Sequence, residues 1–209
     1  MAGVVIIGAG PGIGRAVALR FAREGRPLAL ISRSAGSESL VPEEFSAHSY
    51  VADCTDEDAL RAALDAAVED LGLPEVIVYN AALIRPDAPG ELSMRDQLDA
   101  WAVNVLGALT AAAHLLPGMT QGSFLITGGM PEPKPEYVSL SLGKAGVRTL
   151  VELLSLRYPG IHVASVTIDG PVAPGTDFDP GLIAEHFWTL HAQPRGEWAR
   201  EIVHRGART

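Results

Sequence analysis

The chain has 209 residues, a length that fits one domain built around a single hydrophobic core. Hydrophobic residues make up 47% and charged residues 20%, which is typical of a globular protein and excludes a disordered one. The formal net charge is −9 and no basic run occurs, so the electrostatic drive for binding nucleic acid is missing. We therefore expect a single domain over residues 1–209 and no nucleic-acid partner.

The cysteine content and the N-terminal residues indicate a cytoplasmic protein. Cys54 is the single cysteine, so no intramolecular disulfide can form. The first apolar run follows no basic segment and ends at Gly8, unlike a signal peptide, and no run approaches the ~18 apolar residues of a membrane span. The six histidines have no metal-ligand spacing. We expect no membrane partner and no metal site.

Short apolar runs alternate with segments of helical periodicity along the whole chain. The apolar runs predict strands at 4–7, 28–31, 48–52, 75–79, 123–127, 161–168 and, more weakly, 200–205. The periodic segments predict helices at 13–24, 56–71, 92–116, 139–157 and 182–191. Strands that are apolar on both faces and separated by helices indicate a parallel sheet with helices on both faces. With right-handed crossovers, this is a Rossmann-like, doubly wound α/β fold of about seven strands.

Two local signals refine this outline. Thr55, followed by three acidic residues, is a plausible N-cap for the second helix, because acids in the first turn suit the helix dipole. Residues 130–136 contain three prolines, which forbid regular helix and predict a stiff loop. That loop follows the fifth strand, on the side where open α/β sheets bind ligands.

A glycine-rich turn joins the first strand to the first helix. It contains Gly8, Gly10, Gly12, Ile13 and Gly14. Such a turn needs the backbone freedom of glycine, and a pyrophosphate reaches a helix N-terminus only where side chains are absent. Because the turn follows a strand, opens a helix and precedes a second strand, it predicts a dinucleotide-binding site.

The second strand ends at Ser32-Arg33, about 20 residues beyond the glycines, where the adenosine ribose lies in such folds. An acid at this position would bind the 2′-hydroxyl of NAD, whereas an arginine would bind the 2′-phosphate of NADP. The sequence therefore favours NADP(H) over NAD(H). The alternative is that Arg33 is a solvated surface residue.

The spacing of Gly8, Gly12 and Gly14 resembles the cofactor motif of the short-chain dehydrogenase/reductase family. Further matches follow in chain order over nearly the whole sequence, at Asp53, Asn80, Ala81, Asn104, Lys144, Gly170 and Val172. The resemblance implies the same fold, a bound nicotinamide cofactor and a small-molecule substrate. It also implies a homodimer or homotetramer formed through the helices at 92–116 and 139–157.

The resemblance implies a role for each matching residue. Asp53 would contact the adenine, and Asn80-Ala81 would follow the fourth strand beside the cofactor. Asn104 would bend its helix and hold a proton-relay water, and Lys144 would bind the nicotinamide ribose. Gly170 to Val172 would lie beside the nicotinamide, with Asp169 replacing the proline usual in the family.

The sequence departs from the family at two catalytic positions. The tyrosine expected four residues before Lys144 is Leu140, and the serine expected after the fifth strand falls at Gly128-Gly129. The hydroxyl groups of Tyr137, Ser139 and Ser141 are candidate replacements, as is that of Thr127. For each of them, capping or hydrogen bonding to the backbone is the competing interpretation.

The cofactor motif and the two departures from the family are compatible with three functions. The first is an NADPH-dependent reductase with a non-standard active site, acting on a carbonyl, enone or imine-type substrate. The second is an NADP(H)-binding sensor or inactive partner subunit without redox turnover. The third is a non-redox catalyst that uses the same pocket. The fold cannot separate them, because function depends on the site.

Overall fold

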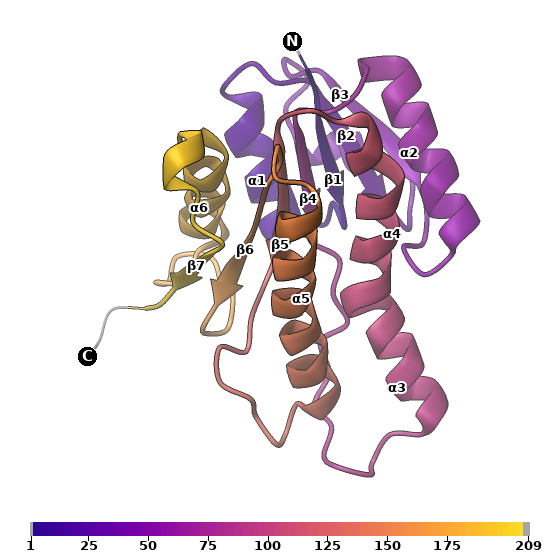
Figure 1. Ribbon diagram of the computed structural model, residues 1–209, viewed down its shortest axis with the longest axis vertical. Helices are drawn as coiled ribbons and strands as arrows, with labels where there is room; N and C mark the ends of the chain where they lie inside the picture. Colours follow the sequence, from indigo (N-terminus) through magenta and orange to yellow (C-terminus); the bar gives the residue numbers. More distant parts are fainter. Residues whose placement is uncertain (1, 207–209) are drawn as a thin grey trace.

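The computed structural model describes residues 2–206 and consists of one parallel sheet with helices on both faces. Seven strands pair in the order β3-β2-β1-β4-β5-β6-β7. Figure 1 shows the sheet at the centre, with α2, α4 and α5 toward one side and α6 toward the other. This is the doubly wound Rossmann-like fold that the sequence predicts.

The strands lie close to their predicted bounds. They are β1 (Val4–Ile7), β2 (Leu28–Ser32), β3 (Ala47–Val51), β4 (Val76–Tyr79), β5 (Ser123–Thr127), β6 (His162–Ile168) and β7 (Glu201–His204). Every pairing is parallel, and β1 has β2 on one side and β4 on the other. The chain reverses its direction of winding at β1, so the carboxyl ends of β1 and β4 form the crevice where such sheets bind ligands.

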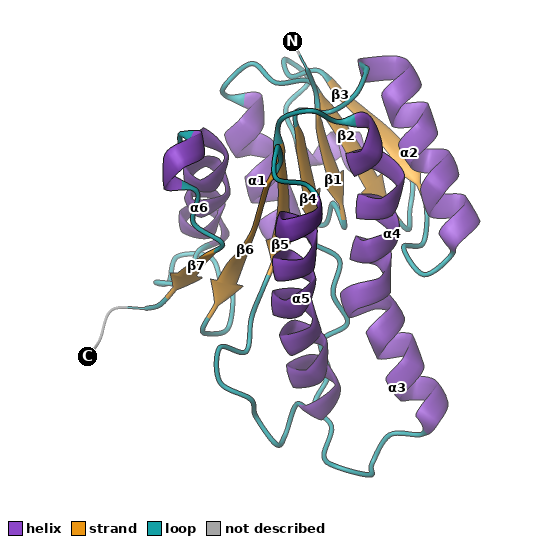
Figure 2. Cartoon of the chain, in the orientation of Figure 1, coloured by secondary structure: helices purple, strands orange, loops and turns teal. Residues whose placement is uncertain are grey.

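The helices also agree with the predicted segments. They are α1 (Ile13–Ala22), α2 (Glu57–Leu71), α3 (Met94–Trp101), α4 (Gly107–Leu115), α5 (Val138–Arg157) and α6 (Pro180–Ala192). A π-helical segment, Ala102–Leu106, joins α3 to α4 into one long rod, visible in Figure 2. Short 3₁₀ helices at Ser37–Leu40, Leu116–Gly118 and Arg195–Glu197 were not predicted.

Alternating side chains of the central strands build two cores. In β1, Val5 and Ile7 join the core under α2, α4 and α5, while Val4 and Ile6 join the core under α1 and α6. All four side chains are at most 3% exposed, which explains why this strand reads as a continuous apolar run.

The N-cap prediction for α2 was wrong by one residue. The cap is Asp56, whose carboxylate accepts a hydrogen bond from the Ala59 backbone N–H at 3.0 Å. Thr55 instead donates both its backbone N–H and its hydroxyl to Asp53. A carboxylate has the stronger interaction with the helix N-terminus, so it takes the capping position.

By length and composition alone, the helical rod Met94–Gly118 would pass for a membrane-crossing segment, with a mean hydropathy of 1.3. Half of that window is buried inside the fold. A buried core helix passes the same test, so this finding is weak evidence for a membrane span.

Candidate functional site

The glycine-rich turn contains two kinds of glycine. Gly8 has φ of +86°, and a Cβ atom there would lie 2.4 Å from the backbone nitrogen of Ala81. A Cβ at Gly14 would lie 2.7 Å from the Gly8 carbonyl oxygen. In contrast, a Cβ at Gly10 or Gly12 would meet no protein atom within 4 Å. The fold therefore requires Gly8 and Gly14, while Gly10 and Gly12 leave open a space that a ligand phosphate fits.

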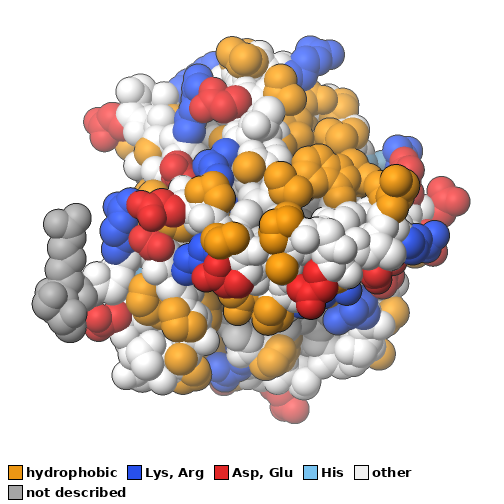
Figure 3. Space-filling model, turned by 90° about the horizontal axis from the view of Figure 1, so that it is seen from below, with side chains coloured by type: hydrophobic (Ala, Val, Ile, Leu, Met, Phe, Trp, Pro, Cys, Tyr) orange, Lys and Arg blue, Asp and Glu red, His pale blue; other side chains and the backbone are white. Residues whose placement is uncertain are grey.

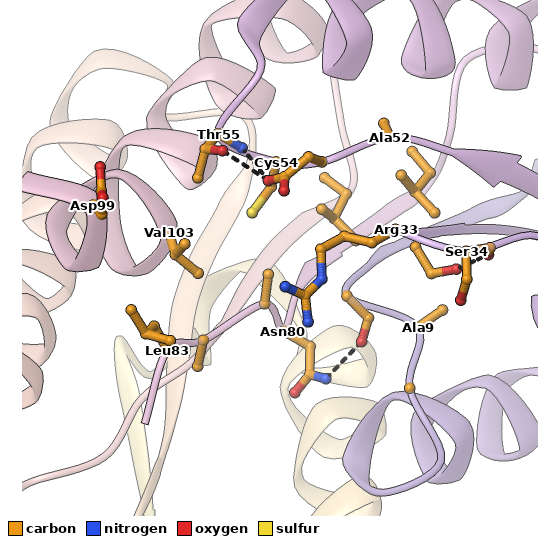
Figure 4. Close-up of a pocket in the computed structure, with 18 residues that line it drawn as sticks. Ala9, Arg33, Ser34, Ala52, Cys54, Thr55, Asn80, Leu83, Asp99 and Val103 are labelled. Carbon is orange, nitrogen blue, oxygen red and sulfur yellow. Dashed lines mark hydrogen bonds between the residues drawn. The ribbon is translucent and has the colours of Figure 1, made fainter. Parts of the chain in front are cut away.

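A cavity of about 560 Å³ opens beside this turn, at the carboxyl ends of β1, β2 and β4. Figure 4 shows its lining side chains converging from several elements that are distant in sequence. Seven of the predicted cofactor-site residues line it: Gly8, Gly10, Ser32, Arg33, Asp53, Asn80 and Ala81. The volume and the position suit the adenosine end of a dinucleotide.

The charged groups of the cavity come from the ends of β2 and β3. The exposed Arg33 side chain extends toward Asn80 in Figure 4, and Asp53 also lines the cavity. Hydrogen bonds from the backbone and hydroxyl of Thr55 hold the pKa of the Asp53 carboxyl below its usual value, and the charge of Arg33 lowers it further. Arg33 is thus a cation available to an anionic ligand group.

Sequence reasoning missed other residues of the cavity. Ser34, Cys54 and Thr55 also line it, as do Leu83, Asp99 and Val103. The first three directly follow predicted strands, so their place was available in the sequence. Burial raises the pKa of the Cys54 thiol, which leaves it protonated. Asp99 and Val103 come from the α3 rod, and no sequence signal marked them.

A series of hydrogen bonds connects the cavity to Lys144. The Asn80 side-chain amide donates to the Gly8 carbonyl at 2.9 Å and accepts from the Thr127 hydroxyl at 2.8 Å. The Nζ atom of Lys144 donates to the Thr127 backbone carbonyl at 2.7 Å. These bonds fix the ends of β1, β4 and β5 and the lysine relative to one another.

Lys144 is 4% exposed and has no carboxylate partner among residues 2–206. Burial penalises its charged form and lowers its pKa to about 8. Asn104, 1% exposed, lies in the π-helical segment and contacts the helix of Lys144. Its amide oxygen accepts from the Leu83 N–H at 3.0 Å, and its amide nitrogen donates to the Leu83 carbonyl at 3.2 Å.

The candidate hydroxyl groups at the start of α5 have other partners. The Ser139 hydroxyl donates to the buried Asp87 at 3.0 Å, and Asp87 also accepts from the Ser139 N–H. The Ser141 hydroxyl accepts from the Lys134 N–H at 3.0 Å. Tyr137 is the half-buried N-cap residue of α5, and its backbone bridges to that of Asp87. These contacts anchor the start of the helix against the loop that follows β4.

The predicted nicotinamide-side segment lies outside the described cavity. Gly170 packs against the Phe178 ring, because a Cβ there would lie 2.2 Å from a ring carbon. Val172 is 40% exposed. The intervening loop folds on itself through a hydrogen bond from the Ala173 N–H to the Phe178 carbonyl. No group of three or more metal-ligating side chains occurs within residues 2–206.

Comparisons with known proteins agree with this geometry. Glucose 1-dehydrogenase 2 of Bacillus subtilis (strain 168) is 31% identical over 187 residues, covering 82% of this chain and 70% of that protein. A solved short-chain dehydrogenase from Rhodopseudomonas palustris aligns with a TM-score of 0.84 and 26% identity over 99% of both chains. An alcohol dehydrogenase from the archaeon Thermococcus sibiricus, complexed with 5-hydroxy-NADP, shares the fold. It aligns with a TM-score of 0.89 and 23% identity over 99% of this chain and 97% of its own. A family model described as short chain dehydrogenase matches residues 2–177, so the chain belongs to the short-chain dehydrogenase family.

Proposed function

We propose that this protein is an NADPH-dependent reductase of a small molecule, with an active site that lacks the usual tyrosine and serine. The observation that carries the proposal is the series of hydrogen bonds that joins the glycine-rich turn and its cavity to the buried Lys144. Members of the family are oxidoreductases that bind nicotinamide cofactors. Gly10 and Gly12 would leave room for the pyrophosphate, and the Nζ atom of Lys144, at the end of β5, would hold the nicotinamide ribose.

The two missing groups narrow the substrate class. Leu140, four residues before Lys144, is 4% exposed and has no exchangeable proton. Neither Gly128 nor Gly129 offers a hydroxyl to polarise a carbonyl. Hydride transfer needs the cofactor held against an electrophile, and that geometry does not depend on the tyrosine. An iminium ion, an activated enone or an activated carbonyl compound would therefore suit this site best.

The decisive experiment is hydride transfer from labelled cofactor. Purified protein should oxidise NADPH in the presence of at least one member of an imine, enone and ketone panel. With NADPH deuterated at C4, the deuterium should appear stereospecifically in the product. Tight NADPH binding with no hydride transfer to any panel member would instead support an NADP(H)-binding sensor or partner subunit. The missing tyrosine and serine favour this second candidate function.

Arg33 should set the preference for NADPH over NADH. It is the exposed cation in the cavity, and Ser32 beside it presents no carboxylate to a ribose hydroxyl. Arg33→Ala should weaken NADPH binding by about 10- to 100-fold, because a charge-assisted pair with the 2′-phosphate is lost. NADH affinity should change by less than about threefold. Titration calorimetry of both cofactors at one salt concentration checks this, and equal losses for both would contradict it.

We further propose that the chain forms a homodimer or homotetramer in the cytoplasm. Large apolar side chains are exposed along the α3–α4 rod and α5: Met94, Leu98, Leu106, Leu109, Leu142, Leu153 and Leu156. Figure 3 looks at the end of the molecule from which α3 and α5 project, and apolar side chains gather on that face. A second copy of the chain would remove them from water.

A further inference from the structure

We propose that Lys144 itself donates the proton to the substrate, the step that a tyrosine performs in ordinary members of the family. This inference rests on the proposed reductase function. It follows from three features of the described residues: the hydroxyl groups nearby are engaged elsewhere, the Nζ atom has unused donors, and no neighbouring charge neutralises it.

The hydroxyl groups of α5 are poorly placed to replace the tyrosine. Those of Ser139 and Ser141 are bonded to Asp87 and to the Lys134 backbone. Tyr137 precedes Lys144 by seven residues, which is about 10 Å along a helix axis. The Nζ atom of Lys144 reaches the carboxyl end of β5, and Arg148 of the same helix reaches the carbonyls just beyond it.

The ammonium group of Lys144 is only partly satisfied by the protein. It has three N–H donors, and one of them bonds to the Thr127 carbonyl. Within residues 2–206, the other two have no hydrogen-bond acceptor at a side chain or backbone. A Cβ at Gly129 would lie 3.7 Å from the Lys144 Cε, which is an ordinary contact distance, so this flank of the lysine is packed. Lys144 is 4% exposed, so its two remaining donors are buried polar groups without a partner in the described part of the chain, and a bound molecule would satisfy them.

Charged groups on the elements around α5 are committed to other partners. Arg148, one turn beyond Lys144, donates to the carbonyls of Gly129 and Met130. The other pairings are Asp87 with Ser139, Asp96 with Ser93, Asp99 with Arg95, Asp169 with Arg205 and Glu201 with Thr167. Burial alone lowers the pKa of Lys144 to about 8, so near neutral pH the side chain can both hold and release a proton.

The proton step balances without any further reactant. A bound reduced nicotinamide would supply the hydride to the electrophilic carbon of the substrate, and the Lys144 ammonium would give one proton to the substrate oxygen or nitrogen. Lys144 is left as a neutral amine and takes a proton from water before the next turnover. In the oxidation direction, the neutral amine accepts the proton of the alcohol.

Cofactor binding should be linked to the same titration. Ribose hydroxyl oxygens next to Nζ would stabilise the ammonium form, so the pKa of Lys144 should be higher in the NADPH complex than in the free protein. When the pKa of a group is higher in the complex than in the free protein, the group strengthens binding. This contribution is complete at pH values below the pKa in the free protein and is lost as the pH rises. NADPH affinity should therefore fall as the pH rises above about 8, by at most tenfold per pH unit.

The lysine content of the chain makes the titration directly observable, because Lys134 and Lys144 are its only lysines. Protein labelled with [13C]lysine should give two Cε resonances, and Lys134→Arg assigns them. The Lys144 resonance should titrate with a pKa of about 8, below the ordinary value of a lysine side chain. Addition of NADPH should raise the Lys144 midpoint. If the pKa of Lys144 is not lowered from the ordinary lysine value, the inference is overturned.

Lys144→Arg separates proton donation from charge and binding. Arginine keeps the cation and the N–H donors but does not release its proton near neutral pH. For Lys144→Arg, we expect NADPH affinity within about tenfold of wild type and turnover reduced by about 10²- to 10⁴-fold. In Lys144→Ala, added methylammonium should partly restore turnover. Lys134→Arg should match wild type in both measurements.

The outcomes distinguish this inference from the function on which it rests. If Lys144→Arg keeps turnover within about tenfold of wild type, Lys144 is not the proton donor, although the reductase function stands. If wild-type protein binds NADPH but reduces no substrate, the proposed function and this inference fail together. The titration of the wild-type lysines needs no variant at position 144, so the inference remains falsifiable if Lys144→Arg does not fold.

Discussion

Gly12→Ala is expected to lose NADPH binding by at least about 100-fold while the protein remains folded. A Cβ at this position meets no protein atom within 4 Å, so the folded chain itself has room for the methyl group. That room lies at the N-terminus of α1, where a pyrophosphate would lie against the backbone. A 100-fold loss corresponds to about 2.8 kcal/mol of binding free energy. NADPH fluorescence titration gives the affinity, and thermal unfolding gives the stability.

Gly14→Ala is the matched control for this prediction. Its Cβ would lie 2.7 Å from the Gly8 carbonyl oxygen, so this methyl group must push the backbone of the turn apart. We expect Gly14→Ala to lower Tm by more than Gly12→Ala does, because the clash is within the protein. NADPH binding by Gly12→Ala at wild-type affinity would show that the pyrophosphate does not lie at this turn.

The contrast between these two glycines shows how far the sequence could define the site. The motif indicated a phosphate-binding turn, because glycines between a strand and a helix have few other uses. It could not tell which glycines serve the fold and which serve a ligand. That distinction depends on whether a Cβ meets the Gly8 carbonyl or open space, and this depends on how the turn folds against the start of α1.

The overall fold was more accessible from the sequence than the catalytic end of the site. Burial on both faces makes β1 and β4 continuous apolar runs, and helical periodicity marks the segments between the strands. The N-cap of α2 was misassigned because Thr55 and Asp56 are both good caps, and only the three-dimensional positions of Asp53 and Ala59 decide between them.

The partners of the α5 hydroxyl groups could not be predicted. Ser139 is bonded to Asp87, which is 52 positions earlier in the chain and follows β4. Nothing in the local sequence of either residue signals that contact, because it arises when the loop after β4 meets the start of α5. The same applies to Lys144: its type and position were evident, but its burial and its single protein acceptor are properties of the folded chain.

Gly128 and Gly129, where the resemblance would put the serine, differ in their surroundings. A Cβ at Gly128 would lie 2.4 Å from the Thr167 hydroxyl oxygen, so the packing of β6 excludes a side chain there. At Gly129 the nearest atom is the Lys144 Cε at 3.7 Å, an ordinary contact distance. Position 129 therefore has room for a Cβ beside the lysine, and position 128 does not.

Leu140→Tyr is expected to raise ketone reduction by about 100-fold. Leu140 lies one helical turn before Lys144, so a tyrosine there would place its phenol on the same face as the lysine. The nearby ammonium would lower the phenol pKa, and a positioned general acid contributes about 10²- to 10⁴-fold to such reactions. Stopped-flow or steady-state kcat for a ketone that wild type reduces slowly measures the gain.

Leu140→Phe is the matched control, because it adds nearly the same bulk without the hydroxyl. Leu140 is 4% exposed, so both variants overfill a packed position and should lose about 1–3 kcal/mol of stability. Their Tm values should therefore agree while their kcat values differ. Equal kcat in two folded, NADPH-binding variants would mean that position 140 does not face the substrate.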